Sequence, residues 1–308
     1  MGSNPKPARA DRFGTNGWLR DWVTRPMVAL SVQELPLHWR ICEMSFVCAK
    51  PAGFQAGDWM VRSVRGALGR ILAEMRNSDA SKAMPASAFE GLFQTHGMVD
   101  GVHIPKPIRL VVAVEGERIR IVIRLFGQAD IWRDCVVEAM AEALRRGIGL
   151  WENGAILREW PMVDWYWQSR ASMAIPDWSG DAILRFTTPF KPGSAEVFSG
   201  DFVTNLPSLV KRVKGMARWI GADLQMETGG GETEGVNRAQ MQILPPGYGL
   251  GGFVKRGRGQ GSAVVGMLGA VELRHISAEL WPILWLGASV GAGGHAIYGF
   301  GGYEVTAV

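Results

Sequence analysis

The sequence predicts an α+β chain of two tandem ferredoxin-like domains, each with the element order β-α-β-β-α-β, and a C-terminal glycine-rich loop. Two observations support this fold class. Strand-like alternation and helix-like periodicity follow one another in the same order in both halves of the chain. The length of 308 residues also suits two domains of about 150 residues. The hydrophobic content of 47% and the charged content of 20% exclude an intrinsically disordered chain.

The first half contains a predicted strand, helix, hairpin and second helix. These elements span residues 39–48, 58–76, 109–126 and 132–146. In the returning strand of the hairpin, every second residue is apolar, and these residues are Ile119, Ile121, Ile123 and Leu125. The arginines between them are Arg118, Arg120 and Arg124. The hairpin is therefore predicted to have one buried face and one arginine-bearing face.

The second half repeats this order with different residues. The predicted elements are a strand at 182–186, a helix at 206–220, a strand or hairpin at 262–274, a short helix at 278–287 and a last strand at 296–305. The repetition predicts a second domain of the same type.

The predicted domains are residues 1–153 and 178–308, joined by a tryptophan-rich connection at 154–177. A further segment, 229–261, holds 11 glycines and is predicted to be a long loop or flexible hairpin.

Composition and motifs exclude several classes of function. The three cysteines lack CxxC spacing, which argues against a zinc knuckle and a disulfide framework and favours a cytoplasmic location. No apolar signal segment and no run of 18 apolar residues is found, so no membrane partner is expected. P-loop, HExxH and GxSxG motifs are absent, and the C-terminal glycines enter a strand rather than the helix that a dinucleotide fingerprint requires. We expect no metal and no cofactor.

Clustered basic residues point to RNA as a partner. A ferredoxin-like sheet with one open, arginine-bearing face is a common RNA-binding platform. The predicted helix at 206–220 carries a line of basic residues opposite its apolar side, and the run at 255–258 (KRGR) combines glycine with basic side chains. For each of these features, a solvated surface is the alternative interpretation.

Five short motifs resemble those of the CRISPR repeat-processing endoribonucleases of the RAMP superfamily. They are RGALG at 65–69, LFGQA at 125–129, RRGIGL at 145–150, RFTTPF at 185–190 and the glycine-rich ending at 280–305. The resemblance implies two RAMP/RRM-like domains that bind the hairpin of a CRISPR repeat. It also implies metal-independent cleavage by a ribose 2′-OH, with a 2′,3′-cyclic phosphate as the product.

The predicted RNA-binding residues combine these basic positions with the C-terminal glycines. They are Arg20, Arg118, Arg120, Arg124, Lys211, Arg212, Lys214, Arg218, Lys255, Arg256, Arg258, Gly291, Gly293, Gly294, Gly299 and Gly301.

The expected catalytic histidine is where this chain departs from the family's pattern. No histidine falls within 58–76, and no tyrosine precedes Tyr166. His38, near the start of the first strand, is one candidate general base, with a purely structural histidine as the alternative. If no histidine serves, Arg25 and Arg40 are the candidates that clamp the phosphate and stabilise charge in the transition state.

Two hypotheses from different classes follow. The first is an endoribonuclease that converts precursor CRISPR RNA into guide RNA and retains the product in an effector complex with other subunits. The second is a non-catalytic RAMP subunit that binds guide RNA in such a complex.

Overall fold

The structure is a computed structural model in which the described residues are 21–22, 25, 27–52, 54, 59–76, 87–94, 97–99, 102–149, 159–190, 205–226, 240–243, 267–293, 296 and 299–308. It combines helices and sheets, and the predicted α+β class is confirmed. None of the helices in these ranges has the length and apolar character that a membrane span requires.

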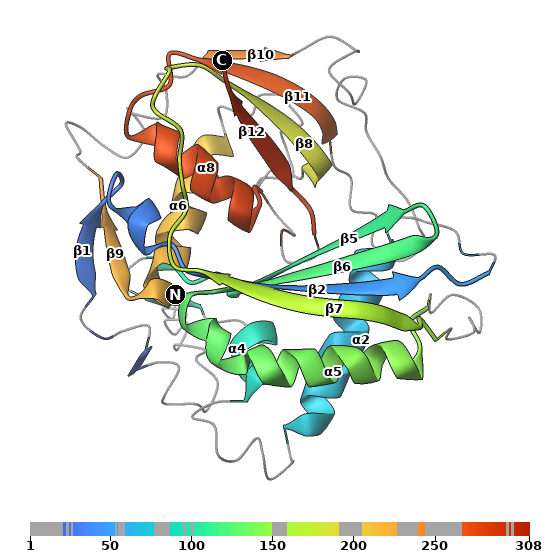
Figure 1. Ribbon diagram of the computed structural model, residues 1–308. Helices are drawn as coiled ribbons and strands as arrows, with labels where there is room; N and C mark the ends of the chain where they lie inside the picture. Colours follow the sequence, from blue (N-terminus) through green and yellow to red (C-terminus); the bar gives the residue numbers. More distant parts are fainter. Residues whose placement is uncertain are drawn as a thin grey trace, which may run out of the picture.

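A four-stranded antiparallel sheet with the order β5-β6-β2-β7 forms the first unit. Its strands are β2 (Ile41–Ala49), β5 (Ile108–Glu115), β6 (Arg118–Phe126) and β7 (Met162–Arg170). Helices α2 (Trp59–Met75) and α5 (Arg133–Arg146) cover one face, and the short helix α4 (Ala88–Phe93) packs beside them (Figure 1). The four apolar side chains of β6 predicted for the buried face have no exposed surface. The opposite face, called here the open face, is directed toward the second unit (Figure 1).

The second unit is a four-stranded antiparallel sheet with the order β10-β11-β8-β12. Its strands are β8 (Ala182–Phe190), β10 (Gln240–Ile243), β11 (Met267–Arg274) and β12 (Tyr303–Ala307). Helices α6 (Leu206–Ala217) and α8 (Leu280–Val290) pack on one side of it (Figure 1). In both units the first strand of the unit lies between its third and fourth strands.

Short elements join the two units. They are β1 (Val28–Ser31), the 3₁₀ helices η1 (Leu35–His38), η2 (Gly127–Trp132) and η4 (Arg218–Ile220), the strands β3 (Met98–Val99) and β4 (Val102–His103), and β9 (Ala222–Gln225). Strand β1 pairs in parallel with β9, and Trp132 of η2 meets Trp219 of η4 edge-on at 6.3 Å. The apolar cores of the two units are therefore continuous.

Strand β7 lies inside the segment 154–177 that the sequence predicted as a connection. It pairs with β2 along most of its length, from Ile41 opposite Arg170 to Val47 opposite Asp164, and it is the edge strand of the first sheet. All nine of its residues are exposed, so it lacks the alternation between buried and exposed positions that marks a half-buried strand.

Candidate functional site

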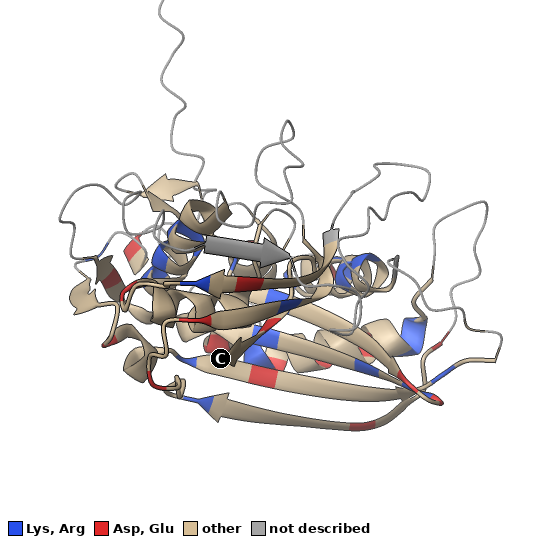
Figure 2. Cartoon of the chain, turned by 90° about the horizontal axis from the view of Figure 1, so that it is seen from above, with Lys and Arg blue, Asp and Glu red and all other residues tan. Residues whose placement is uncertain are grey.

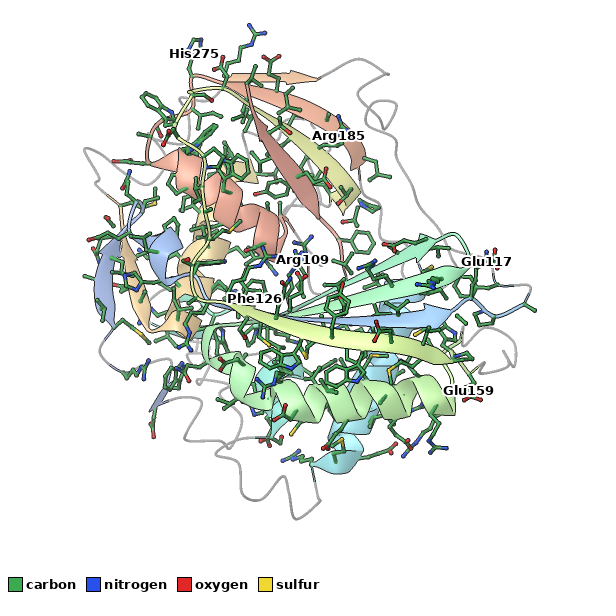
Figure 3. All side chains as sticks on the ribbon, viewed as in Figure 1. Arg109, Glu117, Phe126, Glu159, Arg185 and His275 are labelled. Atoms are coloured by element: carbon green, nitrogen blue, oxygen red, sulfur yellow. The ribbon has the colours of Figure 1, made fainter. Side chains whose placement is uncertain are left out.

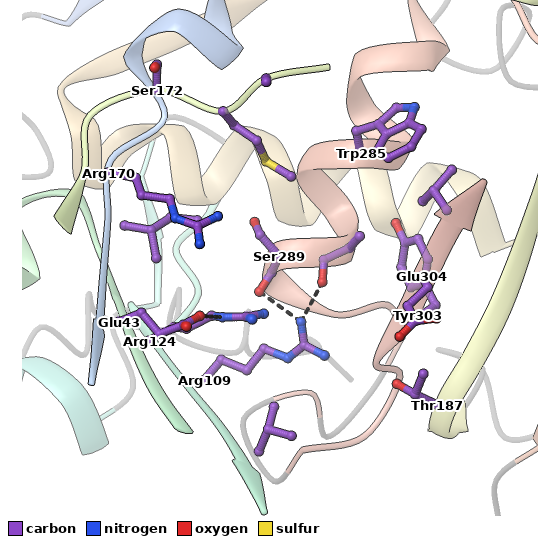
Figure 4. A pocket seen from close by; sticks show the side chains of 16 residues that line it. Glu43, Arg109, Arg124, Arg170, Ser172, Thr187, Trp285, Ser289, Tyr303 and Glu304 are labelled. Carbon is purple, nitrogen blue, oxygen red and sulfur yellow. Dashed lines mark hydrogen bonds and ion pairs between the residues drawn. The ribbon is translucent and has the colours of Figure 1, made fainter. Parts of the chain in front are cut away.

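A cavity of about 850 Å³ lies where the open face of the first sheet meets α8 and β12. Arg109, Glu43 and Arg124 come from the open face, and Arg170 comes from the end of β7 (Figure 4). The opposite wall and rim are formed by Thr187, Trp285, Ser289, Tyr303 and Glu304. A cavity of this size and mixed lining can hold part of a polar ligand.

Arg109 is the most buried cation of this cavity and connects the two units (Figures 3 and 4). Its Nη1 donates to the carbonyl oxygens of Ala288 at 2.6 Å and Ser289 at 2.8 Å, at the C-terminal end of α8. A cation at a helix C-terminus is favourable because unsatisfied carbonyls gather there. Burial, followed by the nearby charges of Arg124 and Arg212, lowers the pKa of the Arg109 guanidinium to about 9, so it is still charged at neutral pH.

Two buried nitrogens of residues that line this cavity have no hydrogen-bond partner in the described part of the chain. They are Nε of Arg109 and Nε1 of Trp285. Buried donors are normally satisfied, because an unpaired donor costs free energy. Both groups are donors only, and both nitrogens lie beneath the cavity surface, where solvent does not reach them.

The charges of Arg124 and Arg170 differ in how far they are compensated. Arg124 donates from Nε to Glu43 at 2.6 Å, while Glu43 also accepts from Gln168. Arg170 is exposed, and no hydrogen bond or ion pair to a carboxylate is found for it among the described residues. Glu304 also lines the cavity, so Arg109 and Arg170 leave a small excess of positive charge that suits an anionic ligand.

Trp39 fixes the chain that holds two of the predicted catalytic residues. Its indole donates from Nε1 to Ser289 Oγ at 3.0 Å, and Ser289 donates to Leu286 in α8. His38 and Arg40, on either side of Trp39, are exposed, and Arg40 lies 3.7 Å from Asp130. The buried tryptophan thus anchors a segment that presents both side chains to solvent.

The three predicted catalytic side chains are not joined to one another. Arg25 stacks on Trp22 at 3.3 Å, and burial lowers its pKa. Within the described ranges, no hydrogen bond or ion pair links Arg25, His38 and Arg40. None of them lines the cavity. A shared catalytic role for them stays a prediction.

The arginines of β6 lie on the open face, as their alternation with buried residues predicted. Arg118 is exposed, and Arg120 contacts Glu115 at 3.0 Å and the hydroxyl of Tyr166 at 2.8 Å. Figure 2 shows that basic and acidic positions are interspersed along the strands. The open face is therefore a mixed-charge surface whose excess of positive charge is concentrated near the cavity.

The basic residues predicted along the helix at 206–220 do not form one solvated line. Lys211 is exposed and Lys214 is half-buried, but Arg212 reaches inward to the carbonyl of Val290 at 3.2 Å. Burial lowers the pKa of Arg212 to about 10. Arg218 is buried and bonded to Asp223 at 3.1 Å, because α6 ends at residue 217 and the tighter turn of η4 redirects it.

Close packing explains why glycine occupies these C-terminal positions. Gly291, Gly299 and Gly301 are buried. Gly301 has φ +65°, and a Cβ there would collide with the carbonyl of Ala292. A Cβ at Gly299 would lie 2.9 Å from Val61 in α2, so this turn also contacts the first unit. RNA contacts by these glycines and by the half-buried Gly293 stay a prediction.

Several predicted RNA-binding residues lie outside the described residues. They are Arg20, Lys255, Arg256, Arg258 and Gly294.

Comparison with known proteins identifies the fold. No protein-family model and no curated protein sequence matches the chain. Among solved structures, the Cas6 (TTHB231) product complex has a TM-score of 0.52 at 15% identity, covering 87% of this chain and 99% of that one. The chain has the Cas6 fold. The resemblance stated from the sequence motifs is thereby confirmed at the level of fold.

Two further solved structures cover 87% of this chain with lower scores. The Cas6 (TTHA0078) product complex matches at 14% identity over 99% of its own length with a TM-score of 0.49. A RAMP protein described as binding different RNA substrates matches at 12% identity over 100% of its length with a TM-score of 0.48.

Within this Cas6 fold, sequence reasoning missed three cations of interest. Arg109 lies opposite Arg124 in the register of β5 and β6. Two like charges on neighbouring strands indicate that each needs a hydrogen-bond acceptor from another element. Arg170 was missed because the sequence pattern does not reveal strand β7. Lys106 lies between two prolines and donates from Nζ to the carbonyl of Phe93. Burial, with the nearby charge of Arg65, lowers the pKa of Lys106 to about 8.

Proposed function

We propose that this chain is an endoribonuclease that binds the hairpin of a CRISPR repeat and cleaves precursor CRISPR RNA into guide RNA. The observation that carries the proposal is the arginine-bearing cavity at the junction of two sheets in a Cas6-type fold. A phosphate in this cavity would lie beside the positive charges of Arg109 and Arg170.

The proposal assigns each sheet and its two helices to a ferredoxin-like domain of the RRM/RAMP type. Their common strand order supports this assignment. The pairing of β7 with β2 favours a first domain that continues to residue 170 and a connection that begins after it. The second domain then starts with β8, and the glycine-rich turn before β12 closes it against α2.

The RNA backbone would follow the open face toward the cavity. Arg118 and Arg120 lie along that face, Arg124 and Arg170 line the cavity, and Arg109 contacts α8 inside it. Arginine suits this task because its planar guanidinium can donate to two phosphate oxygens at once.

The proposed reaction needs no water and no metal ion. The 2′-OH attacks the adjacent phosphorus and loses its proton, the P–O5′ bond breaks, and the 5′-oxygen takes up a proton. The products are a 2′,3′-cyclic phosphate and a 5′-OH. Catalysis then consists of in-line positioning, proton transfer and stabilisation of charge on the phosphate. His38 is the candidate base, and Arg25 and Arg40 are the candidate phosphate clamps.

The second candidate function is a non-catalytic subunit that holds guide RNA in an effector complex. The isolation of His38 favours it, since no hydrogen bond or ion pair to a tyrosine or lysine is found for His38 in the described part of the chain. Retention of the product in a complex is compatible with both functions.

The test is cleavage of the cognate repeat by the full chain in EDTA. We expect single-turnover cleavage, and no cleavage of a repeat with one 2′-deoxy substitution 5′ of the scissile phosphate. If His38 is the base, His38→Ala lowers the rate by roughly 10²- to 10⁴-fold with affinity retained. If the site is built from arginines, Arg40→Ala or Arg25→Ala has that effect instead. Tight binding without cleavage by the parent chain would support the non-catalytic subunit, and dependence on a metal ion would overturn the mechanism.

A further inference from the structure

Among the described residues, strand β7 is paired on one side only, and it carries an unusual number of exposed apolar side chains. Met162, Val163, Trp165, Tyr166 and Trp167 are each between 41% and 56% exposed. Free edge strands in monomeric proteins are generally short, charged or covered, because an open apolar edge invites pairing with another strand. An edge of nine residues with this composition is therefore expected to have a partner.

The backbone of β7 is oriented for such pairing. The N–H of Trp165 points away from β2, since it donates to the side chain of Asp164 at 2.7 Å. Backbone groups alternate along a strand, so Trp165, Trp167 and Ser169 present their N–H and C=O groups to the open edge. A bulge between Val47 and Cys48 of β2 interrupts the register near Val163, which leaves 164–170 as the regular stretch.

This stretch is complementary to a second copy of itself. In an antiparallel pair centred on Trp167, Asp164 lies opposite Arg170 of the second copy, and this pair occurs twice by symmetry. Trp167 lies opposite its own copy, and Trp165 is its diagonal neighbour within aromatic reach. Asp164, Trp167 and Arg170 are all exposed, so each is accessible to such a partner.

We propose that two copies of this chain dimerise through β7, with the strands antiparallel and Trp167 at the two-fold axis. The dimer joins two four-stranded sheets into one sheet of eight strands. On pairing, the Trp165 N–H bonds to the backbone of the opposite strand and releases the Asp164 carboxylate to Arg170 of the second copy. Because the two-fold axis is perpendicular to the sheet, both open faces, and both cavities, lie on the same side. The dimer does not depend on the RNA-processing function. In the dimer without RNA the charge of Arg170 is paired with Asp164 of the second copy, and Arg109 is the buried cation that remains for each cavity.

The test is the oligomeric state of the full chain without RNA, measured by sedimentation velocity over a range of concentrations. We expect a reversible dimer that weakens by about tenfold or more in Asp164→Arg and in Arg170→Asp, because each change opposes like charges twice. The double variant, which restores opposite charges, should recover the dimer. Arg118→Glu, an exposed change on another strand of the same sheet, is the control and should leave it unchanged.

Cysteine cross-linking checks the register and does not depend on the charge variants folding. Under mild oxidation Trp167→Cys should form a covalent dimer, because opposite residues in an antiparallel pair lie within disulfide reach. Ser169→Cys should not, because the two copies of that residue would be about 13 Å apart along the strand direction. Cys42 and Cys48 are buried and Cys135 is half-buried, so the parent chain is the baseline. The proposal would be overturned by a parent chain that is monomeric or by cross-linking of both cysteine variants. It would also be overturned if the exposed tryptophans became shielded from solvent only when RNA is bound.

Discussion

The arginines of α6 and η4 and the arginines of the open face are used in different ways. Arg212 and Arg218 are turned inward and bonded to the carbonyl of Val290 and the carboxylate of Asp223. Arg118 and Arg120 stay at the surface, and Arg124 lines a cavity. The role of a cation therefore depends more on the face of the fold that it occupies than on its position in a basic cluster of the sequence. Arg109 joins the two groups, since it is buried like the first and lines the cavity like the second.

The largest effect is expected from Arg109→Met, which tests that double role. Loss of two charge-assisted hydrogen bonds at the end of α8 should cost about 2 to 3 kcal/mol of stability, even though methionine fills much of the space. Thermal unfolding should show a lower midpoint, and repeat RNA should bind more weakly to the folded variant. Arg118→Met, at an exposed position, is the control and should stay within about 0.5 kcal/mol of the parent. Equal midpoints for the parent and Arg109→Met would mean that Arg109 does not hold the units together.

A matched pair, Arg212→Gln and Arg124→Gln, separates the two uses of arginine. Arg212→Gln should cost about 1 kcal/mol of stability and leave the salt dependence of RNA binding unchanged, because its bond to Val290 is internal. Arg124→Gln should change stability by less than about 1 kcal/mol, since its partner Glu43 is partly exposed.

The RNA measurement for this pair is the log–log slope of affinity against salt concentration. If Arg124 contacts a phosphate, its loss should reduce the slope by roughly 0.7 to 0.9. The same reduction in Arg212→Gln would contradict the division between internal and open-face arginines. An unchanged slope in Arg124→Gln would show that its pairing with Glu43 is its whole role.

The parts of the fold that repeat along the chain could be predicted from the sequence, and the site could be predicted only in part. Alternation in β6 fixes which side chains face the helices, so the direction of Arg124 follows from sequence. The helix at 206–220 was found, but periodicity does not reveal that Arg212 meets the end of α8, which is 78 residues away. Strand β7 has no buried side for a pattern to detect, and so Arg170 was missed. The cavity itself depends on how the two units pack, which no local pattern encodes.

The smallest expected effect concerns Lys106, a further inward-facing cation, and it is a change with pH. Burial and the charge of Arg65 lower the pKa of Lys106 to about 8, whereas a lysine in the unfolded chain titrates near pH 10.4. Between these values the unfolded state binds more protons than the folded state, so stability rises with pH across this window. Below about pH 8 both states are protonated and the contribution is constant.

Lys106→Met removes the penalty of holding the charge, so its unfolding midpoint relative to the parent should be higher at pH 7.5 than at pH 9.5. Lys211→Met, at an exposed position of α6, is the control for loss of a lysine. A difference between Lys106→Met and the parent that is the same at both pH values would show that the amine keeps its proton throughout, and that its bond to the carbonyl of Phe93 offsets the cost of burial.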